Sequence, residues 1–342
     1  KTKLSRSEFV MISTPRGYDP EVYSGFLPKF FHALDKTAGK KEVQQFDFHL
    51  TRAANDDYTL LVVADEHVSG RVIDIPPGSG NVIAPVDSIQ FRDDFMPRLV
   101  EYADSLMRRT PVYGLNLGDM THSEYWFRNK TGMAEYLRLA KDTPFLMYHV
   151  IGNHDYDMKF TDDFEAAGEF RRIIGPTYYS FNLGDIHYVV LDNMYYINEN
   201  EDRSHDTYVD DEQLAWLRKD LEHVDKSKPV FVCMHCSAYA ITGVSNNKVS
   251  VKPNFKNSGT AELGDCFKGF ASVHYLTGDT HINRAVANED MPAGYNNIFE
   301  HNMGAICASW WWTGYVSQNS ICKDGSEGGY MVFTNNGGEV KW

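Results

Sequence analysis

The sequence predicts a layered α/β protein with a largely buried sheet, and three observations carry that prediction. From about residue 53 onward, apolar runs rich in β-branched and aromatic residues recur along the chain. Segments with helical spacing lie between them, most clearly residues 87–109 and 210–224. Most of the runs end in Asp, His or Asn. The six runs cover residues 59–67, 112–119, 145–155, 186–193, 230–235 and 273–281.

Composition narrows the class of protein. The chain has 342 residues, of which 42% are hydrophobic and 23% charged, so it is globular and long enough for one large domain or two of ordinary size. A net charge of −14 argues against a nucleic-acid-binding basic surface. An acidic protein that handles phosphate needs local positive charge, which bound divalent metals supply. No apolar stretch approaches the ~20 residues of a transmembrane segment.

The two ends of the chain differ from the middle in composition and in the secondary structure that they predict. Short strand-like segments at 9–13 and 45–52 predict a partial N-terminal β accessory segment over residues 1–52. Residues 301–342 are rich in aromatic residues, Gly and turn formers, and we interpret them as a β extension that starts a C-terminal module. The helix-and-strand core occupies residues 53–300.

Five of the six runs end in side chains that bind metals, and ligand sites in open α/β sheets form at the carboxyl ends of strands. In an extended chain, positions i and i+2 point to the same side, so Asp65 and His67 would face a common point. Asp279 and His281 repeat that spacing. Asp119 follows a glycine, which allows a close backbone approach.

Two further groups complete the pattern: Asn153, His154 and Asp155 follow Gly152, and His235 ends a strand. Each group alone is ordinary, because a lone Asp-x-His is usually a surface turn and a lone strand histidine is usually buried and hydrogen-bonded. Their common placement favours a metal site. Seven donors exceed the needs of one transition metal and suit two metals that share a carboxylate. The seven are Asp65, His67, Asp119, Asn153, His235, Asp279 and His281.

These residues resemble the five ordered motifs of the calcineurin-like metallophosphoesterases, over roughly residues 55–290. The motifs are Asp65-x-His67, Gly118-Asp119, Gly152-Asn153-His154-Asp155, His235 and Gly278-x-x-His281. The flanking FVMISTPRGY and WWWTG…DGSEGGYMVF stretches resemble the bacterial, Bacteroides-type branch, which has N- and C-terminal β modules.

The resemblance implies a four-layer β-sandwich flanked by helices, with a dinuclear centre of Mn, Fe or Zn, and Mg is also compatible. It assigns one metal to Asp65, His67 and His281, the bridge to Asp119, and the second metal to Asn153, His235 and residue 279. It makes His154 a proton donor to the leaving group or a stabiliser of transition-state charge. Asp155 would orient the His154 imidazole.

Position 279 departs from the family pattern, which usually has His there. Asp279 adds a negative charge and replaces a nitrogen donor with a hard oxygen, so we expect weaker selectivity for Zn and a shift toward Mn or Mg. Alternatively, Asp279 turns away and only His281 binds.

The predicted function is hydrolysis of a phosphomonoester or phosphodiester, in which a metal-held hydroxide attacks phosphorus and His154 assists the leaving group. The expected substrate is a phosphorylated small molecule, lipid or sugar, and the oligomeric state is open. Candidate substrate contacts are Arg284, His122, Tyr239 and Trp311, for which surface or packing roles remain alternatives. Two other functions stay open: a nuclease or pyrophosphohydrolase on the same site, and a scaffold whose second metal site is weakened.

The cellular location is expected to be extracytoplasmic, periplasmic or secreted. No signal peptide is visible at the start of the chain, so we interpret it as removed. A pairing of Cys307 with Cys322 would imply an oxidising compartment. Cys233 and Cys236 lie three apart on a predicted strand and would face opposite sides, which argues against a redox pair or zinc clip there.

Overall fold

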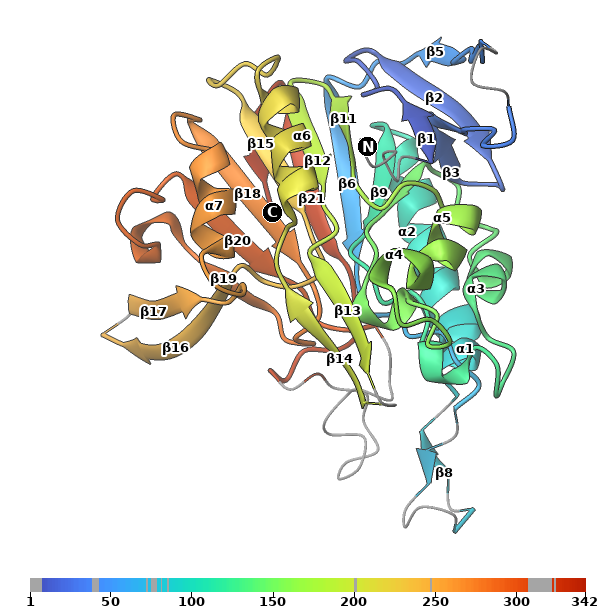
Figure 1. Cartoon of the computed structure of the whole chain (residues 1–342). Coiled ribbons are helices and arrows are strands. Elements are labelled where there is room, and N and C mark those ends of the chain that lie inside the picture. Colours follow the sequence, from blue (N-terminus) through green and yellow to red (C-terminus); the bar gives the residue numbers. More distant parts are fainter. Residues whose placement is uncertain are drawn as a thin grey trace.

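The computed structural model describes residues 8–38, 43–71, 73–74, 79–80, 82–84, 86–199, 202–246, 248–306, 322 and 324–342. Two β-sheets pack against each other, and helices cover the outer face of each sheet (Figure 1). One hydrophobic cluster fills the space between the sheets, and two more lie between a sheet and its helices. This is the four-layer sandwich that the sequence resemblance implies, and that prediction is confirmed.

The first sheet has the strand order β10-β9-β6-β21-β22. Its strands are β6 (Asp57–Val63), β9 (Val112–Asn116), β10 (Met147–His149), β21 (Met331–Asn336) and β22 (Glu339–Lys341). Strands β6, β9 and β10 are parallel, and β21 runs antiparallel to β6. The three parallel strands therefore end at the same edge of the sheet.

The second sheet has the order β11-β12-β15-β18-β20-β19. Its strands are β11 (Tyr179–Leu183), β12 (Ile186–Val190), β15 (Pro229–Cys233), β18 (Ser272–Thr277), β19 (Arg284–Val286) and β20 (Ile298–Asn302). The four central strands are parallel, and β11 and β19 are antiparallel edges. All six apolar runs of the sequence contain one of the parallel strands.

Strand β6 shows why these runs lack polar alternation. Leu60 and Val62 point into the cluster between the sheets, whereas Leu61 and Val63 pack under the helices. Because both faces are buried, every position is apolar, as is usual for parallel strands covered on both sides.

Different helices cover the two sheets. Those over the first sheet are α1 (Asp87–Gln90), α2 (Met96–Met107), α3 (Met133–Leu139), α4 (Asp163–Ala166) and α5 (Gly168–Ile173). The second sheet is covered by α6 (Asp211–Leu221) and α7 (Gly259–Cys266). Asp210 begins α6, because its side chain accepts a hydrogen bond from the Gln213 N–H.

The predicted helix over residues 87–109 is present but interrupted. A π-helical turn, Phe91–Phe95, separates α1 from α2. Pro97 lies in the first turn of α2 and has no N–H to donate to a carbonyl four residues earlier. The helical spacing of apolar residues predicts the helix, whereas the proline favours the π-helical turn that interrupts it.

Several short strands pair outside the two main sheets. The N-terminal ones are β1 (Phe9–Met11), β2 (Tyr18–Tyr23), β3 (Leu27–Lys29), β4 (Phe31–Ala33) and β5 (Leu50–Arg52). The others form the pairs β7 (Ile73–Asp74) with β8 (Val82–Ala84), β13 (Met194–Glu199) with β14 (Asp202–Thr207), and β16 (Tyr239–Ser245) with β17 (Lys248–Pro253).

The division of the chain at residues 52 and 300 stays a prediction. Both flanking segments contribute to the sandwich itself, because Phe31 and Phe333 belong to the cluster between the sheets. None of the described helices combines the length and apolar composition that crossing a bilayer requires.

Candidate metal centre

The candidate ligands lie in loops that follow parallel strands of both sheets. Asp65 and His67 follow β6, Asp119 follows β9, and His235 follows β15. These four side chains are at most 2% exposed. Because the loops come from strands that end at neighbouring edges of the two sheets, residues distant in sequence converge in one buried site.

The backbone of these loops corrects the sequence argument. Asp65 and His67 were expected to face the same way because an extended chain alternates, but both lie beyond β6 and have positive φ angles of 58° and 44°. Asp119, Asp279 and His281 also have positive φ, between 56° and 64°. Non-glycine residues adopt this conformation at a cost of about 1–2 kcal/mol each, so tertiary contacts must hold them there.

Hydrogen bonds between the loops supply those contacts. The Asp65 N–H donates to the Gly118 carbonyl at 3.0 Å, and the His67 N–H donates to the Asp119 carbonyl at 2.8 Å. The Asp279 N–H donates to Asp65 Oδ2 at 3.1 Å. The ligand loops of the two sheets therefore fix one another.

Three ligand atoms form the first candidate metal position. His281 Nε2 lies 3.3 Å from Asp65 Oδ1 and 3.3 Å from His67 Nε2, and the His67 and Asp65 atoms are 3.7 Å apart. Ligands bound to one metal at about 2.0–2.2 Å stand roughly 3–3.6 Å apart. The triangle therefore fits a transition metal, and its donors are two imidazoles and a carboxylate.

Asp119 lies between this position and a second one. Its Oδ2 is 3.5 Å from His67 Nε2 and 3.3 Å from His235 Nε2. Its other oxygen, Oδ1, accepts a 2.7 Å hydrogen bond from the His154 N–H, which fixes the carboxylate. A carboxylate held between two imidazoles of different groups is suited to bridge two cations.

The second position contains His235, Asn153 and Asp279. His235 Nδ1 is 2.7 Å from the Leu117 carbonyl oxygen, so Nδ1 carries the proton and Nε2 faces the site. Nε2 is 3.0 Å from Asn153 Oδ1 and 3.8 Å from Asp279 Oδ1. A nitrogen lone pair facing two oxygen acceptors fits a cation between them.

The pKa shifts show how much negative charge is concentrated here. Burial alone would lower the pKa of His235, but the carboxylates of Asp119, Asp65 and Asp279 raise it well above the usual value. Burial would likewise lower the pKa of His281, but the nearby Asp65 carboxylate outweighs burial and the pKa is raised. The surroundings of His235 and His281 thus favour positive charge, which bound metal ions would provide, whereas burial and the neighbouring imidazoles lower the pKa of His67.

Glycines allow the loops to approach closely. A Cβ on Gly152 would lie 2.2 Å from the Asp119 nitrogen and 2.3 Å from its Oδ1. A Cβ on Gly278 would lie 2.7 Å from Asp65 Oδ2. Any side chain at either position would displace a candidate ligand. Close packing of the loops therefore explains why two of the motifs contain glycine at these positions.

Asp155 is not a candidate ligand, and its side chain instead holds two of the ligand loops together. Its buried carboxylate accepts hydrogen bonds from the N–H groups of Gly152, Asp119 and Thr121, at 2.8–3.0 Å, and from the Thr121 hydroxyl at 2.9 Å. These bonds join the Asp119 loop to the Asn153 loop. The expected effect of Asp155 on the His154 ring stays a prediction.

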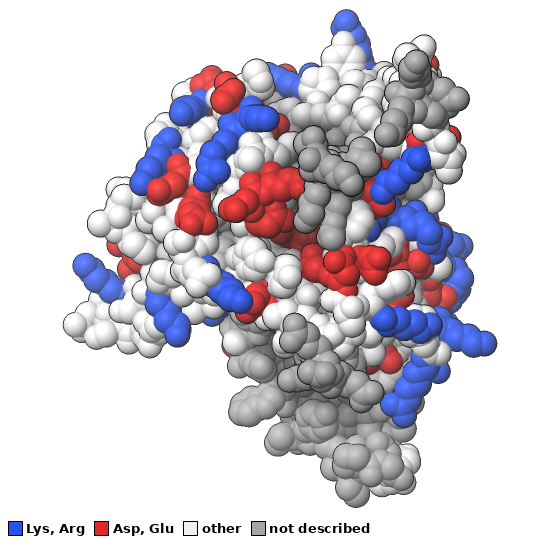
Figure 2. All heavy atoms as spheres, in the orientation of Figure 1, with Lys and Arg blue, Asp and Glu red and all other residues white. Residues whose placement is uncertain are grey.

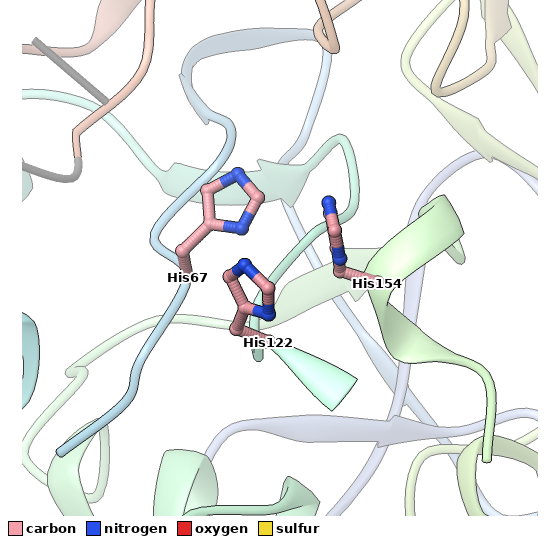
Figure 3. Close-up of side chains that lie close together, drawn as sticks. All are labelled: His67, His122 and His154. Carbon is pink, nitrogen blue, oxygen red and sulfur yellow. The ribbon is translucent and has the colours of Figure 1, made fainter. Parts of the chain in front are cut away.

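Three imidazoles gather beside the first position. Figure 3 shows His67, His122 and His154 from three different loops, with their rings close together. The ring centroids of His122 and His154 are 4.2 Å apart, and those of His67 and His154 are 5.1 Å apart. His122, a low-ranked substrate candidate in the sequence, therefore lies in the site together with His154.

The other predicted substrate contacts are spread out. Arg284 Nη2 donates to Ser237 Oγ at 2.9 Å, two residues after His235. Tyr239 is 2% exposed within the cluster under α6 and α7, and this burial gives its predicted substrate contact no support. Trp311 and the Cys307–Cys322 pairing lie outside the described residues.

Two residues that the sequence argument overlooked lie at the second position. The ligand atoms of His205 and Cys236 lie within 4.8 Å of each other and of an Asp279 oxygen. His205 belongs to the charged segment ENEDRSHDT, which has no strand-end pattern, so only its position in β14 reveals it. A cavity of about 210 Å³ opens there, lined by His205, Asn153 and His154 among others.

A larger cavity of about 990 Å³ lies elsewhere and is strongly acidic. Figure 2 shows Asp and Glu side chains gathered across the middle of this face of the molecule. The acidic lining residues are Glu8, Asp162, Asp163, Asp192, Asp206, Asp210, Asp211, Glu212 and Glu262. Such a lining repels phosphate, so the smaller cavity beside His154 is the better approach for a phosphorylated substrate.

Comparisons with known proteins agree with this geometry. A family model described as calcineurin-like phosphoesterase matches residues 58–288, which contain all of the candidate ligands. The chain belongs to the calcineurin-like phosphoesterase family, and it is a metal-dependent phosphoric ester hydrolase. The family implies a dinuclear metal centre, and the donors described above fit one.

Solved structures were also compared. The chain is similar to a dimetal phosphatase from Danio rerio, with 12% identity over 72% of this chain and 87% of that one, at a TM-score of 0.48. It is similar to a 5'-nucleotidase from Candida albicans, with 14% identity over 74% of this chain and 46% of that one, at a TM-score of 0.38. No curated protein matches the sequence.

Proposed function

We propose that the protein hydrolyses phosphate esters of small molecules, monoesters or diesters, with two metal ions bound side by side. The observation that supports this most directly is Asp119, whose Oδ2 lies 3.5 Å and 3.3 Å from imidazoles of two separate ligand groups. When bound, the two cations would neutralise phosphate oxygens and lower the pKa of a water molecule between them.

The protein's own residues have distinct roles in this proposal. Asp65, His67 and His281 hold the first cation, and Asn153, His235 and Asp279 hold the second. Asp155 keeps the Asp119 loop and the Asn153 loop together through its hydrogen bonds to both loops.

His154 is the proposed proton donor to the leaving oxygen. It is partly exposed, lines the 210 Å³ cavity and neighbours both His67 and His122. An imidazole that lines the cavity in this way is placed to donate a proton to the leaving oxygen of an ester bound there. The His122 ring lies tilted against the His154 ring, with the centroids 4.2 Å apart, and is proposed to orient it.

The metal preference follows from Asp279. A carboxylate in place of a second-site imidazole favours harder ions, so Mn or Mg is proposed over Zn at that position, with Fe or Zn better suited to the two-imidazole first position. The proposal also includes an extracytoplasmic location and the three-part division of the chain. Both are supported by the resemblance of the flanking stretches to the bacterial branch of the family.

The test uses protein stripped of metal and reloaded with Mn or Zn. Turnover is measured on p-nitrophenyl phosphate, bis(p-nitrophenyl) phosphate, mononucleotides and DNA. His154→Ala should keep both metals and lower kcat by about 10²–10⁴-fold. The matched control, His223→Ala at an exposed position two residues after the end of α6, should behave as the parent.

Each other outcome has a definite meaning. Preferential cleavage of DNA would favour the nuclease alternative. Absence of turnover on every phosphoester despite two bound metals would overturn the proposal and favour the scaffold function. Equal activity in His154→Ala and the parent would remove His154 from the proton-transfer role.

A further inference from the structure

Position 279 leaves the second metal position short of a nitrogen donor. Asp279 Oδ1 lies 3.8 Å from His235 Nε2, farther from this nitrogen than Asn153 Oδ1 at 3.0 Å or Asp119 Oδ2 at 3.3 Å. The Asp279 side chain is also 31% exposed, whereas those of Asp119 and His235 are at most 2% exposed. Asp279 therefore stands at the open side of the centre.

A histidine from another element faces that open side. His205 lies on β14, opposite Tyr196 of β13. Its ligand atom lies within 4.8 Å of an Asp279 oxygen, and its ring interacts electrostatically with Asp279, His235 and Asp119. Two ligands on opposite sides of one metal stand about 4.2 Å apart, so this separation is within reach of shared binding.

Alternation along β14 explains why His205 points this way. Residues 205 and 207 lie on one face of a strand and residue 206 on the other. Thr207 lies near the Cys236 thiol beside His235, whereas Asp206 lines the large acidic cavity. His205 lines the small cavity together with Asn153 and His154.

The hairpin is tied to the ligand loop at its base. The Asn193 side chain, just before β13, donates to the Cys236 carbonyl at 2.8 Å and accepts from the Cys236 N–H at 3.3 Å. Asn193 is fully buried. These two bonds hold the hairpin and the His235 loop together as one unit, so the place of His205 is set by the fold.

We propose that His205 is a ligand of the second metal ion and supplies the nitrogen donor that Asp279 replaces. This rests on the two-metal centre of the proposed function. The second ion would then be held by Asp119, Asn153, His235, Asp279 and His205, with the last two forming its solvent side. His205 is chosen over Cys236 because the Cys236 thiol is buried against Met194, with the sulfur atoms 3.4 Å apart.

The test measures metal binding directly. Parent protein, His205→Ala and His205→Asn are stripped of metal and titrated with Mn or Co(II), with stoichiometry from elemental mass spectrometry and affinity from calorimetry. We expect the first affinity to be unchanged and the second to be weakened on the order of 10–100-fold in both variants. The visible absorption of Co(II) at the second position should change, because a nitrogen donor is lost.

Two further variants make the test specific. Asp279→His in the His205→Ala background should restore the second affinity, since it returns a nitrogen donor from the opposite side. His223→Ala serves as the exposed-histidine control and should bind as the parent does. Melting temperatures of all variants show whether a loss of metal reflects a loss of folding.

The proposal is overturned by an unchanged second affinity and Co(II) spectrum in both His205 variants. It is also overturned if Cys236→Ser weakens the second metal and His205→Ala does not, which would assign the donor to the thiol. A failure of the proposed function is seen separately, as a fully loaded parent that cleaves no phosphoester while His205→Ala still loses the second ion.

Discussion

The two halves of the metal centre differ in how tightly the fold encloses them. The first position contains the candidate ligands Asp65 and His67, which are at most 1% exposed, and His281, at 12%. The second contains Asp279, which is 31% exposed and lies near His205 of the β13–β14 hairpin. The closed half keeps the family's ligand pattern, whereas the open half carries the departure from it.

The difference has a physical reason. A change of donor in the closed half would leave a buried charge or a buried gap, at a cost of a few kcal/mol. At the open half water can solvate a carboxylate, and a neighbouring element can supply another donor. A dinuclear centre therefore tolerates substitution where it meets solvent.

The largest effect that we expect comes from the residue that joins the two halves. Asp119→Asn should abolish binding of at least one metal, weaken the other, and lower kcat by about 10³-fold or more, because the amide cannot bridge two cations. Metal stoichiometry and turnover are measured together, with the exposed Asp142→Asn as the matched control. Two metals at parental affinity in Asp119→Asn would mean that the halves are independent.

The next effect separates the halves. Asp279→Ala should lower the stoichiometry from two metals toward one and leave the affinity of the retained ion unchanged, because the closed half does not use residue 279. Asp65→Ala should instead remove the first ion. Elemental mass spectrometry on both reloaded variants checks this pair, and an unchanged stoichiometry in Asp279→Ala would show that Asp279 is not a ligand.

The smallest effect concerns the support of the open half. Asp192, next to Asn193 at the base of the hairpin, is buried, and burial, followed by the charge of Asp163, raises its pKa to about 8. The unfolded carboxyl ionises near pH 4, so the folded state loses stability as pH rises from about 4 toward 8. The slope contributed is at most about 1.4 kcal/mol per pH unit.

Asp192→Asn removes this titration while keeping an acceptor for the Tyr156 hydroxyl, which lies 2.9 Å from Asp192 Oδ1. The variant should therefore gain stability over the parent as pH rises from 5 to 8, measured by urea unfolding of metal-loaded protein. Parallel stability curves for the two proteins over this range would contradict the assignment.

Much of the site could be predicted because neighbouring residues in the sequence form recognisable patterns around its side chains. Apolar runs that end in Asp65-x-His67, Gly118-Asp119 or His235 identify strands and the donors that follow them. Burial on both faces forces such runs to be apolar throughout, and the loop glycines are required because Cβ atoms at Gly152 and Gly278 would strike ligands. These constraints act within a few residues, so they are visible in the sequence.

The sequence by itself therefore determined the strands, the order of the candidate ligands and the class of chemistry. Only the tertiary structure decided how the loops turn, that His122 stands beside His154, and that His205 faces Asp279. The left-handed conformations of Asp65 and Asp279 are held by hydrogen bonds to other loops, and His205 reaches the centre through a hairpin pinned by Asn193. Contacts between segments far apart in the chain leave no local pattern, because they depend on where the two sheets bring the loops together.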